Sequence, residues 1–219
     1  MKAQRTLGPA RRQKLFERLR TANPAPRGEL RYRTPYQLLV AVILSAQATD
    51  RSVNLATRDL FRVAPTPERM LQLGESGLAG HIRAIGLWRT KARHVIAMSQ
   101  LLVERHGGAV PSDRAALEAL PGVGRKSANI VLNVAFGVAT IAVDTHVFRV
   151  ANRTGLAPGR TVRAVEDGLL HNVPARFRRD AHHWLILHGR YVCTARRPAC
   201  LTCLLADLCL YPDKPAPER

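Results

Sequence analysis

The chain has 219 residues, and 46% of them are hydrophobic, which is enough for a packed core in one large domain or two small lobes. Its 34 lysine and arginine residues outnumber 16 aspartate and glutamate residues, so the formal net charge is +18. This charge favours a polyanionic partner over a membrane, and the longest apolar run, Leu38 to Leu44, is too short to span a bilayer. The N-terminus lacks the apolar stretch of a secretory signal, so we expect a cytoplasmic protein.

The first half of the chain is predicted to be helical. Basic residues alternate with Leu15, Phe16 and Leu19 at helical spacing, and prolines between the apolar segments mark the ends of helices. The turn Ile85-Gly86-Leu87 precedes the longest of these helices, which Gly107 and Gly108 close. The predicted helices cover residues 10–21, 35–45, 51–62, 67–73 and 90–105.

Two further helices near the middle are predicted to form a helix–hairpin–helix at about residues 113–136. Ser112 is a plausible N-cap, with Asp113 in the first turn, for a helix that runs to Leu120. The second helix, Arg125 to Phe136, is apolar on most sides and should be buried between neighbours. With no β-rich run of useful length, the fold class is expected to be all-α.

The hairpin between these helices combines a phosphate grip with a candidate nucleophile. Its Gly-x-Gly turn can bring backbone N–H groups close to an anion, and the following helix N-terminus attracts phosphate. Lys126 lies at that helix start, either as an amine nucleophile or as a plain phosphate contact. The candidate DNA contacts in the hairpin are Gly122, Val123, Gly124 and Arg125.

Asp144 is the candidate acid that could serve Lys126. The helix from Lys126 to Phe136 runs about 15 Å away from the hairpin, and Thr140 to Asp144 in extended form returns about the same distance. Path length therefore allows Asp144 to lie beside Lys126. Asp144 is also a good N-cap for a helix from Thr145 onward, and the two roles are compatible.

All four cysteines fall in one window, Cys193, Cys200, Cys203 and Cys209, with the spacing C-x6-C-x2-C-x5-C. This clustering favours a metal site over disulfides. Only one pair has the close spacing typical of zinc, and the wider loops suit a [4Fe–4S] cube, although zinc stays open on spacing alone. Arg196 and Arg197, in the same loop, either face a phosphate backbone or are ordinary solvated charges.

Other catalytic apparatus is missing from the sequence. There is no H-E-x-x-H metal motif, no phosphate-binding loop of the Walker type and no G-x-S-x-G nucleophile elbow. His182, His183 and His188 lie on one predicted helix with apolar neighbours, and we interpret them as packing or surface groups.

Several of these segments resemble endonuclease III, the bacterial DNA glycosylase and abasic-site lyase of base excision repair. The resemblance rests on residues 120–138, 140–155, 182–193 and 45–50, together with the cysteine spacing, and extends from about residue 10 to 211. It implies a six-helix barrel domain at 28–138 and a second domain, 1–27 plus 139–219, whose loop 193–209 holds a [4Fe–4S] cluster. Its implied partner is damaged double-stranded DNA, bound by a monomer at the nucleoid.

The resemblance also implies roles for individual residues. Lys126 stands at the position of the family's Schiff-base lysine and Asp144 at that of its catalytic aspartate. Gln47 matches the residue that fills the gap left by an extruded base, and Leu87 matches a wedge in the opposite strand; without the resemblance, both would be ordinary structural residues. The sequence departs from the familiar pattern at Trp88-Arg89-Thr90, beside the wedge, so opposite-strand contacts should differ.

The implied activity is excision of oxidised pyrimidines through a Lys126 Schiff base, followed by strand cleavage 3′ to the abasic site by β-elimination. One alternative is a monofunctional enzyme similar to adenine glycosylase, which normally lacks a lysine at this hairpin position. Another is a noncatalytic helix–hairpin–helix DNA-binding protein, against which Lys126 and Asp144 both argue.

Overall fold

The computed structural model describes residues 5–214, and the regular structure within that range is helical, without a strand. The predicted all-α class is therefore confirmed. The chain divides into two compact units, which are described separately below. The first, the central unit, comprises Glu29–Val138, and the second, the terminal unit, combines the residues up to Gly28 with those from Ala139 onward.

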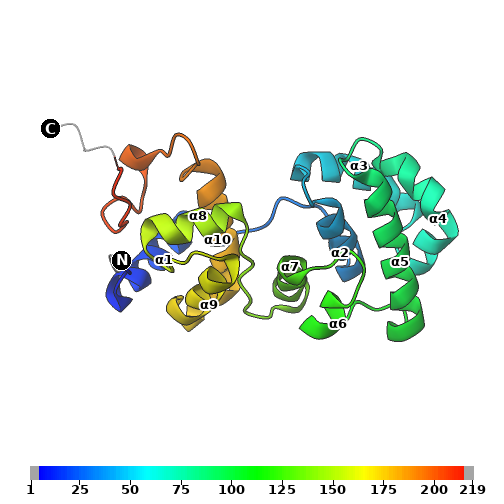
Figure 1. Cartoon of the computed structure of the whole chain (residues 1–219), viewed down its shortest axis with the longest axis horizontal. Helices are drawn as coiled ribbons and strands as arrows, with labels where there is room; N and C mark the ends of the chain where they lie inside the picture. Colours follow the sequence, from blue (N-terminus) through cyan, green and yellow to red (C-terminus); the bar gives the residue numbers. More distant parts are fainter. Residues whose placement is uncertain (1–4, 215–219) are drawn as a thin grey trace. The chain divides into compact units, whose positions relative to one another are not determined.

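The central unit has an uncharged and mostly apolar helix at its core. Every residue of α2 from Tyr36 to Leu44 is buried, because the helix carries no charged side chain that would require solvent. α3, α5 and α7 all pack on α2, and α4 lies alongside α5 (Figure 1). The helices of this unit are α2 (Pro35–Leu44), α3 (Asp50–Val63), α4 (Pro67–Ile82), α5 (Trp88–His106), α6 (Arg114–Glu118) and α7 (Arg125–Phe136).

Most helix starts in this unit follow local sequence, with two corrections to the predicted elements. Asp113, not Ser112, caps α6, because its carboxylate accepts from the N–H groups of Ala115 and Ala116 at 2.9 and 3.1 Å. α4 does not end at Leu73 but continues to Ile82 across a kink at Gly74, whose φ is 70°. Burial of the apolar residues beyond the kink extends the helix.

The terminal unit is built around an aromatic cluster of residues from opposite ends of the sequence. Phe16 stacks on Phe177 with ring centroids 5.6 Å apart, and Trp184 contacts both rings. The indole N–H of Trp184 also donates to the carbonyl of Asn23 over 2.8 Å. The helices are α1 (Pro9–Ala22), α8 (Thr145–Thr154), α9 (Val162–Asn172), η1 (Ala175–Phe177), α10 (Arg178–Tyr191) and η2 (Cys200–Thr202).

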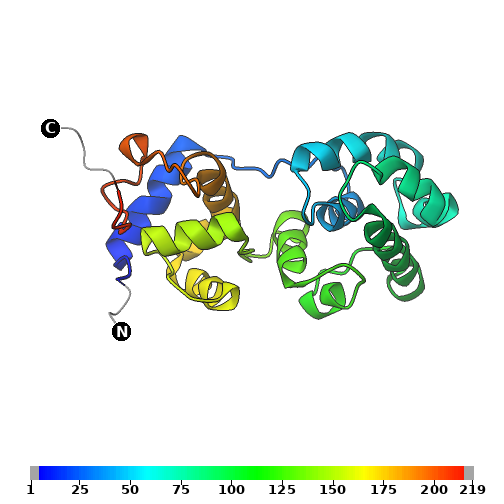
Figure 2. The same cartoon turned by 45° about the horizontal axis from the view of Figure 1, so that its top comes forward.

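Helix α1 is tied to the segment that contains the cysteines, residues 193–209, called here the cysteine loop. Arg18 donates to the carbonyl of Leu204 over 2.7 Å and forms an ion pair with Asp207, and Arg11 donates to the Asp207 carbonyl over 2.9 Å. In Figure 2, α1 runs beside this loop. The loop, which has little core of its own, is thereby held in place by basic side chains of α1.

Candidate functional site

The hairpin between α6 and α7 has the geometry of an anion site. The N–H of Val123 donates to the carbonyl of Leu120 over 3.0 Å, and Gly122 has a φ of 79°, which a residue with a side chain rarely adopts. Val123 is buried and anchors the turn to the core. Gly124 is the N-cap of α7 and has no side chain to satisfy the first N–H groups of that helix, so these donors are open to a ligand.

Lys126 is the second residue of α7 and its side chain is exposed. Within residues 5–214 it has no hydrogen-bonded or ionic partner, whereas its neighbour Arg125 pairs with Glu118 across the hairpin at 3.9 Å. The amine of Lys126 is therefore not engaged by a carboxylate within the described residues.

Gln47 and Leu87 share an unusual backbone. They are the non-glycine residues with positive φ in the described chain, 53° and 58° respectively. Both side chains are exposed, and 58% of the leucine surface is accessible, so Leu87 is not an ordinary core leucine. Such conformations cost about 1 kcal/mol or more each, and they concentrate at functional sites.

Helix α5 connects these loops to the hairpin. Leu87 is the N-cap of α5, and the backbone of Gly86 approaches that of Gln47: a Cβ placed on Gly86 would be 3.8 Å from the Gln47 carbonyl oxygen. Further along α5, the side chain of His94 lies against Gly122. The predicted filler, wedge and hairpin thus belong to one compact unit. Sequence reasoning missed His94, because nothing local in the pattern shows what it touches.

Asp144 is the N-cap of α8, as its position in the sequence predicts. Its Oδ1 atom accepts from the N–H groups of both His146 and Val147, at 2.9 and 2.8 Å. Oδ2 has no partner among the described residues. One carboxylate oxygen therefore orients the group, while the other is available for chemistry. Asp144 belongs to the terminal unit and Lys126 to the central unit, so their proximity stays a prediction from path length.

The histidines of α10 pack within the terminal unit. His182 is buried with Nδ1 2.9 Å from the Ala142 carbonyl oxygen, in the segment that leads to Asp144. His188 is buried with Nε2 3.6 Å from the sulfur of Cys203, and burial lowers its pKa to about 4, so it is neutral near pH 7. Its contact with the cysteine loop was not predicted.

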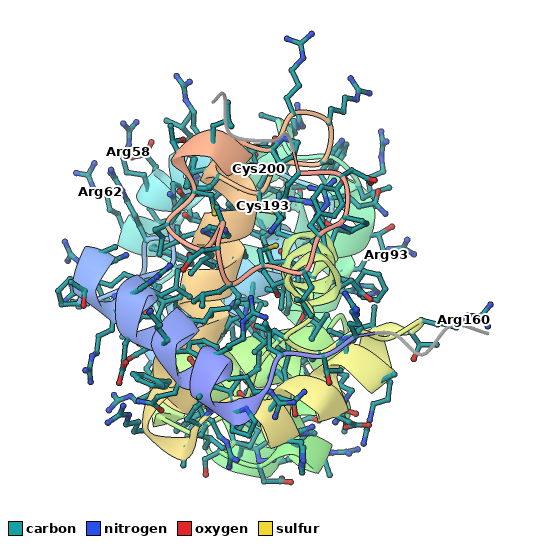
Figure 3. All side chains as sticks on the ribbon, turned by 90° about the vertical axis from the view of Figure 1, so that its left-hand side faces the viewer. Arg58, Arg62, Arg93, Arg160, Cys193 and Cys200 are labelled. Carbon is teal, nitrogen blue, oxygen red and sulfur yellow. The ribbon has the colours of Figure 1, made fainter. Side chains whose placement is uncertain are left out.

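The four cysteines line one pocket of the terminal unit, together with residues that include Arg153 and His188. No three cysteine, histidine or carboxylate side chains within residues 5–214 converge on a point that a single metal ion would occupy. Four thiols around one pocket fit a cluster with several iron atoms. Figure 3 shows Cys193 and Cys200 within this part of the chain.

Burial disfavours the charged form of two of the sulfurs, and nearby donors partly offset this effect. Burial and, to a smaller extent, the charges of the neighbouring cysteines raise the pKa of the Cys203 and Cys209 thiols, so thiolates at these positions need nearby cations and donors. The backbone N–H groups of Leu205 and Tyr211 donate to the sulfurs of Cys203 and Cys209 at 3.4 and 3.5 Å. Arg153 approaches the sulfur of Cys193 at 3.6 Å. Such contacts stabilise an anionic iron–sulfur group.

Helix α8 also holds the cysteine loop. Arg149 donates to the carbonyl oxygens of Cys193 and Gly189 at 2.8 and 2.7 Å, and Arg153 donates to that of Thr194 at 2.7 Å. The same helix is thus capped by Asp144 at its start and hydrogen-bonded to the cysteine loop through Arg149 and Arg153. Within the loop, Arg196 and Arg197 are exposed.

Comparison with known proteins identifies the chain. Residues 40–175 match a family model described as HhH-GPD superfamily base excision DNA repair protein, and residues 193–209 match the iron-sulfur binding domain of endonuclease III. Endonuclease III of Escherichia coli (strain K12) is 58% identical over 205 residues, which are 94% of this chain and 97% of that relative. The chain belongs to the endonuclease III family.

Other members support the same assignment. Endonuclease III of Treponema pallidum (strain Nichols) is 60% identical over 195 residues, 89% of this chain and 92% of the relative. A solved structure of a trapped endonuclease III–DNA covalent intermediate, an estranged-adenine complex, has a TM-score of 0.87 and 41% identity, covering 93% of this chain and 96% of that one.

Membership of the endonuclease III family confirms three expectations. The protein is a base excision repair DNA glycosylase and abasic-site lyase. It has the fold of endonuclease III. Its cofactor is a [4Fe–4S] cluster, which decides between the cluster and the zinc site that cysteine spacing left open. No helix within residues 5–214 is both long enough and apolar enough to cross a membrane.

Proposed function

We propose that this glycosylase and lyase excises oxidised pyrimidines from double-stranded DNA, with Lys126 as nucleophile and Asp144 as its acid–base partner. The observation that carries the proposal is the exposed, unpartnered amine of Lys126 at the start of α7, directly after the hairpin. A phosphate bound by the hairpin would hold the damaged nucleotide at a fixed distance from that amine.

In the first stage, Nζ of Lys126 attacks C1′ of the extruded nucleotide, and the bond from C1′ to the base breaks with its electron pair leaving on the base. Asp144 stabilises the positive charge that develops on the sugar and accepts a proton from the lysine. The free Oδ2 atom is suited to this role because Oδ1 is occupied by the helix cap. No hydrolytic metal ion is required for this step.

In the second stage, the sugar ring opens to an imine between C1′ and Nζ. The imine acidifies the protons on C2′, and loss of one of them expels the 3′ phosphate by β-elimination. Water then hydrolyses the imine and restores the lysine. The strand is cleaved on the 3′ side of the abasic site.

The DNA contacts in this proposal come from both units. Gly122, Val123, Gly124 and Arg125 grip the backbone of the damaged strand, Gln47 fills the vacated stack and Leu87 parts the opposite strand. The exposed positions and strained backbones of Gln47 and Leu87 support their assignment. Arg196 and Arg197, exposed in the cysteine loop, add contacts to phosphate.

The cluster in this proposal is held by Cys193, Cys200, Cys203 and Cys209. When bound, it fixes the cysteine loop, which presents Arg196 and Arg197, and supplies no step of the excision. The net charge of +18 directs the protein to DNA, so we place it at the nucleoid in the cytoplasm, acting as a monomer because one chain carries every group the reaction uses.

Borohydride trapping on abasic-site DNA tests the role of Lys126. The cluster-loaded protein should form a covalent adduct that is lost in Lys126→Ala, while Lys14→Ala, which removes another exposed lysine, should retain it. Absence of an adduct with the wild-type protein would refute the lyase chemistry and favour a monofunctional or noncatalytic protein. An adduct that survives in Lys126→Ala would assign the nucleophile elsewhere.

A further inference from the structure

Helix α5 contains a buried lysine that the proposed chemistry does not use. Only 4% of the Lys91 surface is exposed, and its Nζ atom has no hydrogen-bond partner within the described chain. Burial lowers the pKa of this amine, because the charged form loses solvent and gains nothing in return. A buried ammonium group without an acceptor is costly, and an acceptor supplied by a ligand would stabilise it.

The N-terminus of the same helix is also unsatisfied. α5 is 19 residues long and its N-cap, Leu87, provides no side-chain hydrogen bond. The first intrahelical bond is from the N–H of Lys91 to the carbonyl of Leu87, so the preceding N–H groups of the turn have no such partner. No acidic side chain lies in the first turn. Since helical side chains lean towards the N-terminus, the Lys91 side chain is directed towards this turn, on the buried side of α5 that also carries Val95 and Met98.

Two arginines surround this helix start with positive charge. The guanidinium carbon of Arg89 lies 4.2 Å from the centroid of the Trp88 ring, and Trp88 packs on the core of the central unit. Stacking on an anchored indole holds Arg89 in place while its N–H groups stay accessible. Arg93, one turn further along α5, is exposed and extends away from the ribbon in Figure 3.

We propose that the N-terminal turn of α5 binds a phosphodiester group of the undamaged strand, with Lys91 and Arg89 as its cationic ligands. Open N–H donors, a buried ammonium group without an acceptor and a stacked guanidinium together match a phosphate oxygen shell. The undamaged strand is the favoured source because Leu87, the proposed wedge in that strand, is the residue at which α5 begins. The inference therefore rests on the proposed function. The site would fix the register of the wedge through a second grip on the DNA backbone.

Replacing single phosphates by an uncharged analogue shows which phosphate contacts the start of α5. Each phosphate near the lesion, on either strand, is replaced in turn by a methylphosphonate in a duplex that carries an uncleavable tetrahydrofuran abasic site, and the Kd is measured. For the wild type, one position on the undamaged strand should weaken binding roughly tenfold, the scale of a charge-assisted hydrogen bond. Lys91→Met should show a smaller loss of affinity than the wild type when that phosphate is neutralised, and Lys14→Met should keep the wild-type response.

Thermal unfolding provides a second readout. A merely structural lysine would give Lys91→Met a lower Tm, whereas removal of an unpaired buried charge should leave the Tm unchanged or higher. Arg89→Ala, a change at an exposed position, should reduce the response at the same phosphate without disturbing the core. This variant keeps the test decisive if Lys91→Met folds poorly.

Three results would overturn the inference. They are an undiminished methylphosphonate response in both variants, a response only on the damaged strand, and no response at any phosphate of the undamaged strand. The borohydride adduct separates this failure from that of the proposed function. Wild-type protein that forms the adduct but fails the phosphate test refutes the α5 site alone, whereas absence of the adduct refutes the lyase chemistry.

Discussion

The backbone N–H of Val147 donates to Oδ1 of Asp144 over 2.8 Å, and the N–H of His146 donates to the same oxygen. Both capping hydrogen bonds of α8 therefore use one side of the carboxylate. The second oxygen is left for the reaction, and the cap fixes the orientation at which it is presented. The structural and chemical roles of Asp144 can consequently be separated by substitution.

Asp144→Asn should preserve the cap and lose the chemistry. Asparagine caps helices about as well as aspartate, so the free energy of unfolding should change little. Without a carboxylate to accept the proton, excision of an oxidised pyrimidine should slow by about a hundredfold or more. Asp144→Ala should add a loss of about 1 kcal/mol of stability. Denaturant unfolding and single-turnover excision measure the two effects, and equal stability losses in both variants would contradict the separation.

The two hairpin glycines should respond differently to alanine. Gly122 has a φ of 79°, and a Cβ there would be 3.0 Å from the Cβ of His94, so Gly122→Ala should destabilise the protein by about 1–2 kcal/mol. Gly124 has an ordinary negative φ and no atom within 4 Å of an added Cβ. Gly124→Ala should therefore keep the wild-type Tm but weaken binding to abasic DNA, because its methyl group would lie in the path of a phosphate. Unchanged DNA affinity would exclude a close backbone approach there.

Substitution of Gln47 should separate backbone strain from base filling. Gln47→Gly relieves a left-handed conformation with φ of 53° and should stabilise the fold by up to about 1 kcal/mol. Both Gln47→Gly and Gln47→Ala remove the proposed filler, so excision from a damaged duplex should fall more than binding to undamaged DNA. If excision and undamaged binding fell by the same factor in Gln47→Gly, the filler role would be wrong.

Loss of the contacts between α1 and the cysteine loop should make the cluster easier to remove. Arg18 joins α1 to the Leu204 carbonyl and to Asp207, within the cysteine loop. Arg18→Ala should therefore lose the visible absorbance of the cluster faster in the presence of an iron chelator. Gln13→Ala, on the same helix but hydrogen-bonded to Glu17 of that helix, should bleach at the wild-type rate. Identical rates for Arg18→Ala and the wild type would show that the cysteine loop holds the cluster without α1.

The helices were largely predictable because their signals are local. Threonine caps and proline at the first turn set the starts of α2 and α4, and apolar spacing predicted their buried faces. The predicted end of α4 at Leu73 was wrong, because the apolar residues after Gly74 continue the helix on the core. The N-cap of α6 was misplaced by one residue because serine and aspartate are equally good caps, and only the dihedral angles decide between them.

The identity of the main site residues was predictable from the sequence, but the contacts that position them were not. Spacing and family resemblance selected Lys126, Asp144 and the cysteines, whose signals lie in short motifs. The positive φ of Gln47 and Leu87, the burial of Lys91 and the contact of His94 with Gly122 depend on how separate helices pack. Contacts between separate helices produce no periodic pattern in a single sequence, so the sequence alone does not predict them.

The terminal unit is assembled from segments on either side of the central unit in the sequence, and this arrangement orders its assembly. The hydrogen bond between Asn23 and Trp184 joins residues 161 positions apart, and that between Arg18 and Asp207 joins residues 189 positions apart. During synthesis the central unit can fold before either partner leaves the ribosome, because domains fold as units. Helix α1 therefore makes its contacts with the cysteine loop only after the cysteines have emerged. A truncated nascent chain would contain the hairpin and Lys126, but its first helix would not be anchored.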